Sequence, residues 1–137
     1  MDLCAGAATL VAGTPVQGDT SLSSNDLQFA ANTCVPRNNA GPDDFYNVTV
    51  GVGQTLTATA TPTGSSSFTD LALILLTSCT DLCCWANSDT GRGATPEVLT
   101  YTNATGSLQN LVLVVDTYDN GYGDSAGPYT LSIALAP

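Results

Sequence analysis

The sequence predicts an all-β fold, an antiparallel β-sandwich of eight or nine strands that forms one domain over residues 1–137. Thr, Val, Gly, Asn and Ser dominate the composition, whereas the helix formers Glu, Lys and Gln are rare. Short segments that alternate between apolar and polar residues recur along the chain, and turn residues separate them at the spacing of a sandwich. A chain of 137 residues can bury one sizeable core without a second one.

Three segments show the strand pattern most clearly. Residues 45–50 place Tyr46 and Val48 on one face and Asn47 on the other. Residues 55–61 alternate Thr with apolar side chains throughout, as a half-buried strand does, and residues 71–76 are a continuous apolar run typical of the middle of a sheet. The other predicted strands are 8–11, 15–19, 85–86, 98–102, 111–115 and 129–135, and residues 116–128 are predicted to form an acidic, glycine-rich loop.

Charged residues are scarce and mostly acidic. Twelve acidic residues against two basic ones, Arg37 and Arg92, give a net charge of -10. This charge argues against nucleic acid and against an anionic membrane surface, because both would repel the chain. No apolar run is long enough to cross a bilayer, so we expect no membrane insertion. The chain has no His, which removes the usual general base and the zinc sites built on His, and we expect no enzyme activity.

The five cysteines indicate an oxidising compartment. Their spacing does not supply the two pairs of a structural zinc site, so a disulfide framework with one cysteine left over fits better. We therefore expect a secreted or cell-surface protein. No signal peptide is recognisable, so we expect that a leader has been removed or that the segment comes from a longer secreted chain.

A series of short motifs spans nearly the whole chain. In order they are Cys4, Val16-Gln17-Gly18-Asp19-Thr20, Asn25-Asp26, Cys34, Gly41-Pro42-Asp43-Asp44-Phe45-Tyr46, Gly53-Gln54-Thr55-Leu56, Asp70, Ser78-Cys79, Cys84-Trp85-Ala86-Asn87-Ser88-Asp89, Leu113-Val114-Val115-Asp116 and Gly127-Pro128-Tyr129-Thr130-Leu131. This order resembles the bacterial pre-peptidase C-terminal domain and its jelly-roll relatives in secreted bacterial proteins. The chain departs from that pattern in the extra Cys83 and in the long acidic stretch after Asp116.

The resemblance implies a jelly-roll-like sandwich that serves as an accessory module, binds calcium and engages polymers such as collagen or polysaccharide. It also implies the disulfide pairs Cys4–Cys34 and Cys79–Cys84, with Cys83 as the alternative partner of Cys79.

Calcium takes oxygen ligands from carboxylates, amides and carbonyls, and the candidate ligands are Asn25, Asp26, Asp43 and Asp44. The alternative is that Asp and Asn here cap turns through their own backbone. A second acidic cluster does not match an EF-hand loop, because Gly127 stands where a Glu is needed; its members are Asp116, Asp119, Asn120 and Asp124. Asp70 and Asp89 are interpreted first as turn residues.

Aromatic side chains on loops can stack on sugar rings or on extended chains. Tyr118 and Tyr122 lie in the predicted acidic loop and are the candidate ligand-binding residues, whereas Trp85 fits the core of a sandwich better. Asn47 and Asn103 each begin an N-glycosylation acceptor pattern, which is weak evidence in a chain so rich in Thr.

Together these features predict a non-catalytic, calcium-stabilised accessory domain that contacts an extracellular polymer. The alternative hypothesis is a structural subunit of an extracellular filament or surface layer, a possible homo-oligomer in which unpaired strand edges join neighbouring subunits.

Overall fold

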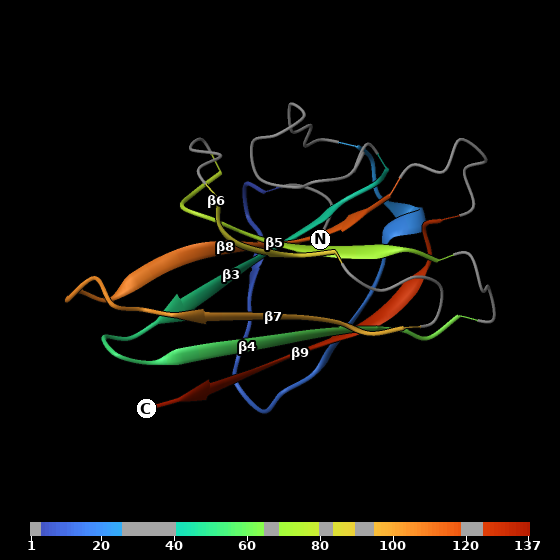
Figure 1. The fold of residues 1–137 in the computed structure, drawn as a ribbon. Helices are drawn as coiled ribbons and strands as arrows, with labels where there is room; N and C mark the ends of the chain where they lie inside the picture. The colour runs from blue at the N-terminus through green and yellow to red at the C-terminus, as the bar shows by residue number, and fades with distance from the viewer. Residues whose placement is uncertain (1–3, 26–40, 65–68, 80–83, 90–94, 119–124) are drawn as a thin grey trace.

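The computed structural model describes residues 4–25, 41–64, 69–79, 84–89, 95–118 and 125–137. It confirms the predicted β-sandwich, in which a five-stranded sheet faces a four-stranded sheet (Figure 1). The described residues form nine strands and one short 3-10 helix, Thr20–Leu22. No helix in this part of the chain has the length and apolar character needed to span a membrane.

The strand order is that of a jelly roll with one added edge strand. In the five-stranded sheet the neighbours run β1 (Ala8–Thr9), β3 (Asp44–Val50), β8 (Gln109–Thr117), β5 (Leu71–Leu76) and β6 (Cys84–Ser88). In the other sheet they run β2 (Val16–Asp19), β9 (Pro128–Ala136), β4 (Thr55–Pro62) and β7 (Glu97–Thr102). Successive strands from β2 onward change sheet except at β5 and β6, and every pair is antiparallel except β1 with β3.

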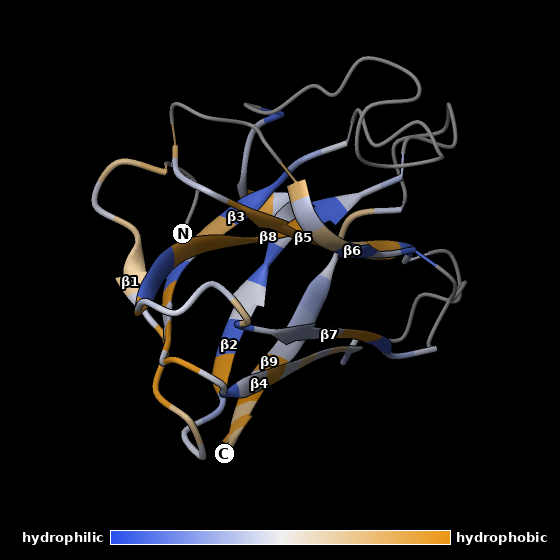
Figure 2. Cartoon of the chain, turned by 60° about the vertical axis from the view of Figure 1, so that its left-hand side comes forward, coloured by the Kyte–Doolittle hydropathy of each residue, from blue (hydrophilic) through white to orange (hydrophobic). Residues whose placement is uncertain are grey.

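The main core lies between the two sheets, which face each other in Figure 2. The predicted faces of the strands are confirmed. Tyr46 and Val48 of β3 point into this core, as do the apolar residues of β4 and the residues of β9 at positions 129, 131 and 133. β5 lies between β8 and β6, and all six of its residues are buried, as its continuous apolar run predicts. Its alternate side chains Ile74 and Leu76 belong to a second apolar cluster on the outer face of the five-stranded sheet.

A buried chain of hydrogen bonds crosses the main core. The Tyr129 hydroxyl donates to Asp44 Oδ2 at 2.5 Å, and the Tyr46 hydroxyl lies 2.7 Å from that of Tyr129. Burial is the main reason that the pKa of Tyr129 lies far above its ordinary value, so its hydroxyl stays a donor. Gly18 makes room for this ring, because a Cβ at that position would lie 2.3 Å from the Tyr129 hydroxyl oxygen.

The predicted disulfide pairs are wrong. Cys4 is bonded to Cys79, with 5.7 Å between their Cα atoms, which excludes both Cys4–Cys34 and Cys79–Cys84. The physical reason is the parallel pairing of β1 with β3, which lays the N-terminal segment along the five-stranded sheet, where Cys4 packs on the outer apolar cluster. Cys84 is also disulfide-bonded, and Cys34 and Cys83 lie outside the described residues.

The boundary of one predicted loop is also wrong. β8 continues to Thr117, so Asp116 is a buried strand residue paired with Ala72, and the predicted loop begins later. Asp70 and Asp89, interpreted first as turn residues, are buried as well. In a sequence, an acidic residue after an apolar run predicts the end of a strand. Here β8 continues past this point, because Asp116 and Thr117 pair with β5.

Candidate functional site

A row of acidic side chains crosses one end of the five-stranded sheet on its outer face. Asp44 pairs with Val115, so Asp43, directly before β3, and Asp116 of β8 follow as the next neighbours. Asp116 in turn pairs with Ala72 of β5. Leu73 pairs with Ser88 in β6, which places Asp89 beside Ala72.

Strand alternation shows that these carboxylates share a face. Val115 lies in the core between the sheets, whereas Val114 lies in the outer cluster, so Asp116 points outward with Val114. The same alternation places Asp43 on the outer side with Phe45, and Asp44 on the inner side with Tyr46. Asp43 and Asp44, although adjacent in sequence, therefore point to opposite faces of the sheet. We call Asp43, Asp116 and Asp89 the acidic row.

The acidic row is buried. Asp43 and Asp116 have no exposed surface and Asp89 is 8% exposed. Asp116 Oδ1 accepts a hydrogen bond from the backbone N–H of Thr117 at 2.7 Å, while Asp116 Oδ2, within the described part of the chain, has no hydrogen-bond partner. Burial, above all, raises the pKa of Asp116 to about 9; the carboxylates of Asp43 and Asp89 raise it too, whereas the Thr117 N–H lowers it.

The structure brings part of the predicted calcium set together and separates the rest. The Asp43 backbone N–H donates to Ser24 O at 3.1 Å, so the segment that ends at Asn25 lies beside the start of β3, and the Asn25 side-chain oxygen is buried. Asp44 accepts hydrogen bonds from Tyr129 and Ser23 on the opposite face of the sheet. Asp26 lies outside the described residues.

The arrangement is not a preformed metal centre. Among the described residues, no three His, Cys, Asp or Glu side chains already converge closely enough to hold a metal ion. Asp116 and Asp89 stand on opposite sides of Ala72, so their Cα atoms are about 10 Å apart, which is two inter-strand spacings.

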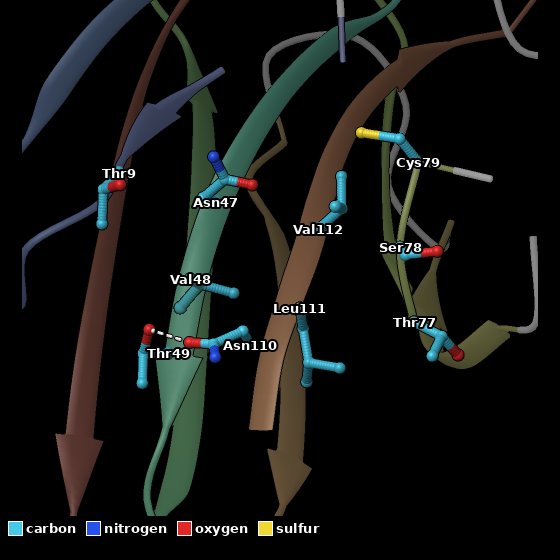
Figure 3. Close-up of a pocket in the computed structure, with 10 residues that line it drawn as sticks. All are labelled: Thr9, Asn47, Val48, Thr49, Thr77, Ser78, Cys79, Asn110, Leu111 and Val112. Carbon is cyan, nitrogen blue, oxygen red and sulfur yellow. Dashed lines mark hydrogen bonds between the residues drawn. The ribbon is translucent and has the colours of Figure 1, made fainter. Parts of the chain in front are cut away.

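A depression lies further along the same outer face (Figure 3). Its volume is about 380 Å³, and its lining residues are Thr9, Asn47, Val48, Thr49, Thr77, Ser78, Cys79, Asn110, Leu111 and Val112. The Thr49 hydroxyl donates to Asn110 Oδ1 at 2.8 Å, and the Asn47 amide donates to the Ala7 carbonyl oxygen at 2.9 Å. None of the lining residues is charged, so the depression presents hydroxyl and amide groups.

The sequence analysis did not identify this depression. The signal available was the polar face of the strand at residues 45–50, where Asn47 and Thr49 alternate with apolar residues. Thr9 of β1 and residues 77–79 line its sides. The Cys4–Cys79 disulfide links residues 77–79 to the segment just before β1.

Of the two tyrosines predicted to bind a ligand, Tyr118 lies within the described residues. Tyr118 follows β8 directly and is half-buried, and its backbone N–H donates to Asp70 O at 3.1 Å. Tyr122 lies outside the described residues. Trp85 packs against the main core, with its ring centroid 5.5 Å from that of Tyr101. Asn103, in the second glycosylation pattern, is fully buried, and its amide donates to the carbonyl oxygens of residues 50, 51 and 107.

No protein family's sequence pattern matches the chain, and no curated protein matches it either. Several solved structures are similar to it, among them the following two. The pre-peptidase C-terminal domain of a collagenase from Bacillus anthracis matches with a TM-score of 0.56 and 16% identity over 92% of this chain and 93% of that one. CsCBM6-3 from Clostridium stercorarium, solved in complex with cellobiose, has a TM-score of 0.39 and 15% identity over 96% and 97%, a likeness too distant to carry an argument. The collagenase domain confirms the predicted resemblance in fold.

Proposed function

We propose that this chain is a non-catalytic accessory domain of a protein that works outside the cell, where the domain contacts a neutral polymer and is stabilised by calcium. The observation that carries the proposal is the uncharged depression on the outer face of the five-stranded sheet. Its volume of about 380 Å³ falls within the usual range of ligand sites, and its amide and hydroxyl groups suit a ligand rich in hydrogen-bonding groups. A polysaccharide and a peptide backbone both have that chemistry.

An extracellular location is supported by the cysteines. The Cys4–Cys79 disulfide joins residues that are 75 positions apart, and such bonds persist in oxidising compartments and are rare in the cytosol. The shared fold is that of a domain of a collagenase, which fits an accessory role beside a catalytic domain.

The non-catalytic role is supported by what the acidic groups do. The chain has no His and no Lys, so a catalytic proton transfer at neutral pH would have to use a carboxylate, a Tyr or a Cys. Asp44 accepts hydrogen bonds inside the main core, and Glu97, the one Glu in the chain, is buried and accepts from the Ser88 hydroxyl at 2.7 Å. These interactions hold the two carboxylates in place inside the sandwich.

Calcium is part of the proposal because the segment that ends at Asn25 meets the start of β3 beside Asp43. Asn25, Asp26 and Asp43 stay the proposed contributors, while Asp44 is engaged on the other face. An ion that binds only the folded state stabilises it by mass action, by about 2.7 kcal/mol at a free concentration 100 times the dissociation constant.

The polymer contact is tested by filling the depression. Thr49 is exposed on the outer face of the five-stranded sheet, and Thr100 is exposed on the outer face of the four-stranded sheet, so Thr49→Trp and Thr100→Trp are matched variants. We expect the purified domain to co-sediment with insoluble cellulose, chitin or collagen fibres. Thr49→Trp should lose at least about tenfold in affinity, while Thr100→Trp should bind like the parent.

Two further results discriminate the alternatives. A loss of binding in Tyr118→Ala with no loss in Thr49→Trp would move the contact to the predicted aromatic site after β8. Failure to bind any of these polymers, together with filaments of the purified protein in electron micrographs, would favour the structural-subunit hypothesis instead.

A further inference from the structure

The disulfide partner of Cys84 is one of two cysteines. The chain has five cysteines, and Cys4 is bonded to Cys79. Cys84 is also disulfide-bonded, so its partner is Cys34 or Cys83, and the other of these two has no partner within the chain. The choice decides whether the second disulfide joins two adjacent residues or ties together two distant parts of the chain.

Backbone geometry disfavours the adjacent cysteine, Cys83. Consecutive Cα atoms are about 3.8 Å apart across a trans peptide, whereas the Cα atoms of a disulfide are usually about 4.4–6.8 Å apart. β6 begins at Cys84, and this side chain packs against the apolar cluster on the outer face of the five-stranded sheet. A distant partner therefore has to reach Cys84 over this outer face.

The outer apolar cluster is buried, although the four-stranded sheet packs on the opposite face. Two of its six members, Ile74 and Val114, have no exposed surface. Among the described residues, the partly buried hydrophobic side chains that pack against this cluster are those of Cys4 and Cys84. Two cysteine side chains are too small to keep water away from six residues, so another part of the chain covers them.

Residues 26–40, which lie outside the described ranges, leave and rejoin the sandwich at one end of the five-stranded sheet. The Asp43 N–H donates to Ser24 O at 3.1 Å, and the Gly41 N–H donates to Thr117 O at 3.0 Å. This segment is the longest of those outside the described ranges, and its composition suits an apolar contact. Its apolar residues are Leu27, Phe29, Ala30, Ala31 and Val35.

Cys34 is close enough along the chain to reach Cys84. Thr117 pairs with Leu71, and Cys84 pairs with Leu76 at the other end of β5. From Gly41, Cys84 is therefore about 20 Å away along the strands and about 14 Å away across three strand spacings, or about 25 Å in all. A disulfide spans about 5–6 Å between Cα atoms, and the stretch from Cys34 to Gly41 spans up to about 23 Å when extended. The two lengths together cover the distance.

We propose that a disulfide joins Cys34 to Cys84 and fixes residues 26–40 over the outer apolar cluster, as a third layer of the sandwich. Cys83 is then the cysteine without a partner in the chain. This inference is independent of the proposed polymer contact and of calcium.

The bond forms by two thiol–disulfide exchanges with a disulfide oxidoreductase as the oxidant. The thiolate of one cysteine attacks a sulfur of the donor disulfide and releases one donor thiol. The second cysteine then attacks the mixed disulfide and releases the other donor thiol. The two cysteines lose two electrons and two protons, and the donor disulfide is reduced to a dithiol.

The direct test is peptide mapping of the whole chain without reduction, after free thiols have been alkylated in denaturant. We expect peptides joined through Cys34 and Cys84, with the alkyl group on Cys83, and tandem fragmentation between residues 83 and 84 distinguishes these two positions. Thiol titration in denaturant should find one thiol per chain in the parent and none in Cys83→Ser. A bond between Cys83 and Cys84, with Cys34 alkylated, would overturn the inference.

Two variants test whether the bond holds the segment on the cluster. Cys34→Ser combined with Cys83→Ser removes the bond and prevents Cys83 from taking the vacated place, and Cys83→Ser alone is the matched control. The double variant should melt about 10–20 °C below the control, because the bond closes a loop of about 50 residues. Below its melting temperature it should also bind an apolar fluorescent dye several-fold more strongly, because the outer cluster is uncovered. A double variant that melts and binds dye like the control would contradict a third layer held by this bond.

Discussion

Replacing Asp116 by Asn should change how the stability of the ion-free protein depends on pH. In the unfolded chain the Asp116 carboxyl has a pKa of about 3.8, and in the folded protein its pKa is about 9. Between these values the folded state keeps a proton that the unfolded state has released. Stability therefore falls as pH rises from about 4 to about 9, by about 1.4 kcal/mol for each pH unit. Below pH 4 both states are protonated and this cost is absent.

The expected magnitude at neutral pH follows from the same values. Between pH 3.8 and pH 7 lie about three pH units, so the carboxyl costs about 4 kcal/mol at pH 7 in the absence of a cation. Asn cannot ionise, so Asp116→Asn should be more stable than the parent in chelator at pH 7, by up to about 4 kcal/mol. The two proteins should approach each other in stability near pH 4.

The assay is urea unfolding in chelator at pH 4, 5.5, 7 and 8.5, followed by the fluorescence of Trp85. This residue is the one Trp in the chain, and it packs against the core, so its emission reports global unfolding. The measured quantity is the difference in unfolding free energy between parent and variant, because the titration of groups that do not interact with Asp116 cancels in that difference. A difference that stays constant from pH 4 to pH 8.5 would refute the reasoning.

Three further predictions follow from the described contacts. Peptide mapping without reduction should recover Cys4 linked to Cys79. Replacing both cysteines by Ser should lower the free energy of unfolding by about 4 kcal/mol, in the chain-entropy account of a loop closed across 75 positions. A loss below about 1 kcal/mol would show that the disulfide adds little stability. Gly18→Ala should destabilise by about 1–3 kcal/mol, since its methyl group would displace the Tyr129 hydroxyl from its buried partners, and an unchanged thermal melting curve would contradict that contact. Asn103→Ala should lower the free energy of unfolding by about 3 kcal/mol or more, because three carbonyl oxygens lose a donor. Mass spectrometry of protein secreted from a glycosylating host should show no glycan on Asn103, because its amide is buried.

Strand positions were predictable because alternation is a local property. Residues 55–61 were expected as a half-buried strand, and β4 runs Thr55–Pro62 with its apolar residues in the core. Residues 111–115 were also expected as a strand, but the end of β8 was not predictable in the same way. Asp116 looks like the start of a polar loop until its pairing with Ala72 is known.

The candidate site was predictable only in part. Asp43 was chosen because it opens a strand, and the structure places it beside a fully buried carboxylate. Asp44 also stands at the start of this strand, but the alternation of side chains along β3 points it into the core, where the Tyr129 hydroxyl donates to it. Asp89 is an isolated acidic residue, which by itself predicts a turn, and nothing local in the sequence indicates that it is buried.

The sequence by itself determined the fold class, most of the strands and the face that each strand buries, because these depend on the period of the side chains over five to ten neighbouring residues. Only the tertiary structure decided which cysteines meet and which acids share a surface. Asp43, Ala72, Asp89 and Asp116 lie far apart along the chain, and the register of four neighbouring strands brings them into one row. Cys4 reaches Cys79 because β1 lies along β3. Such contacts depend on the order in which strands pair, and composition and local pattern leave that order open.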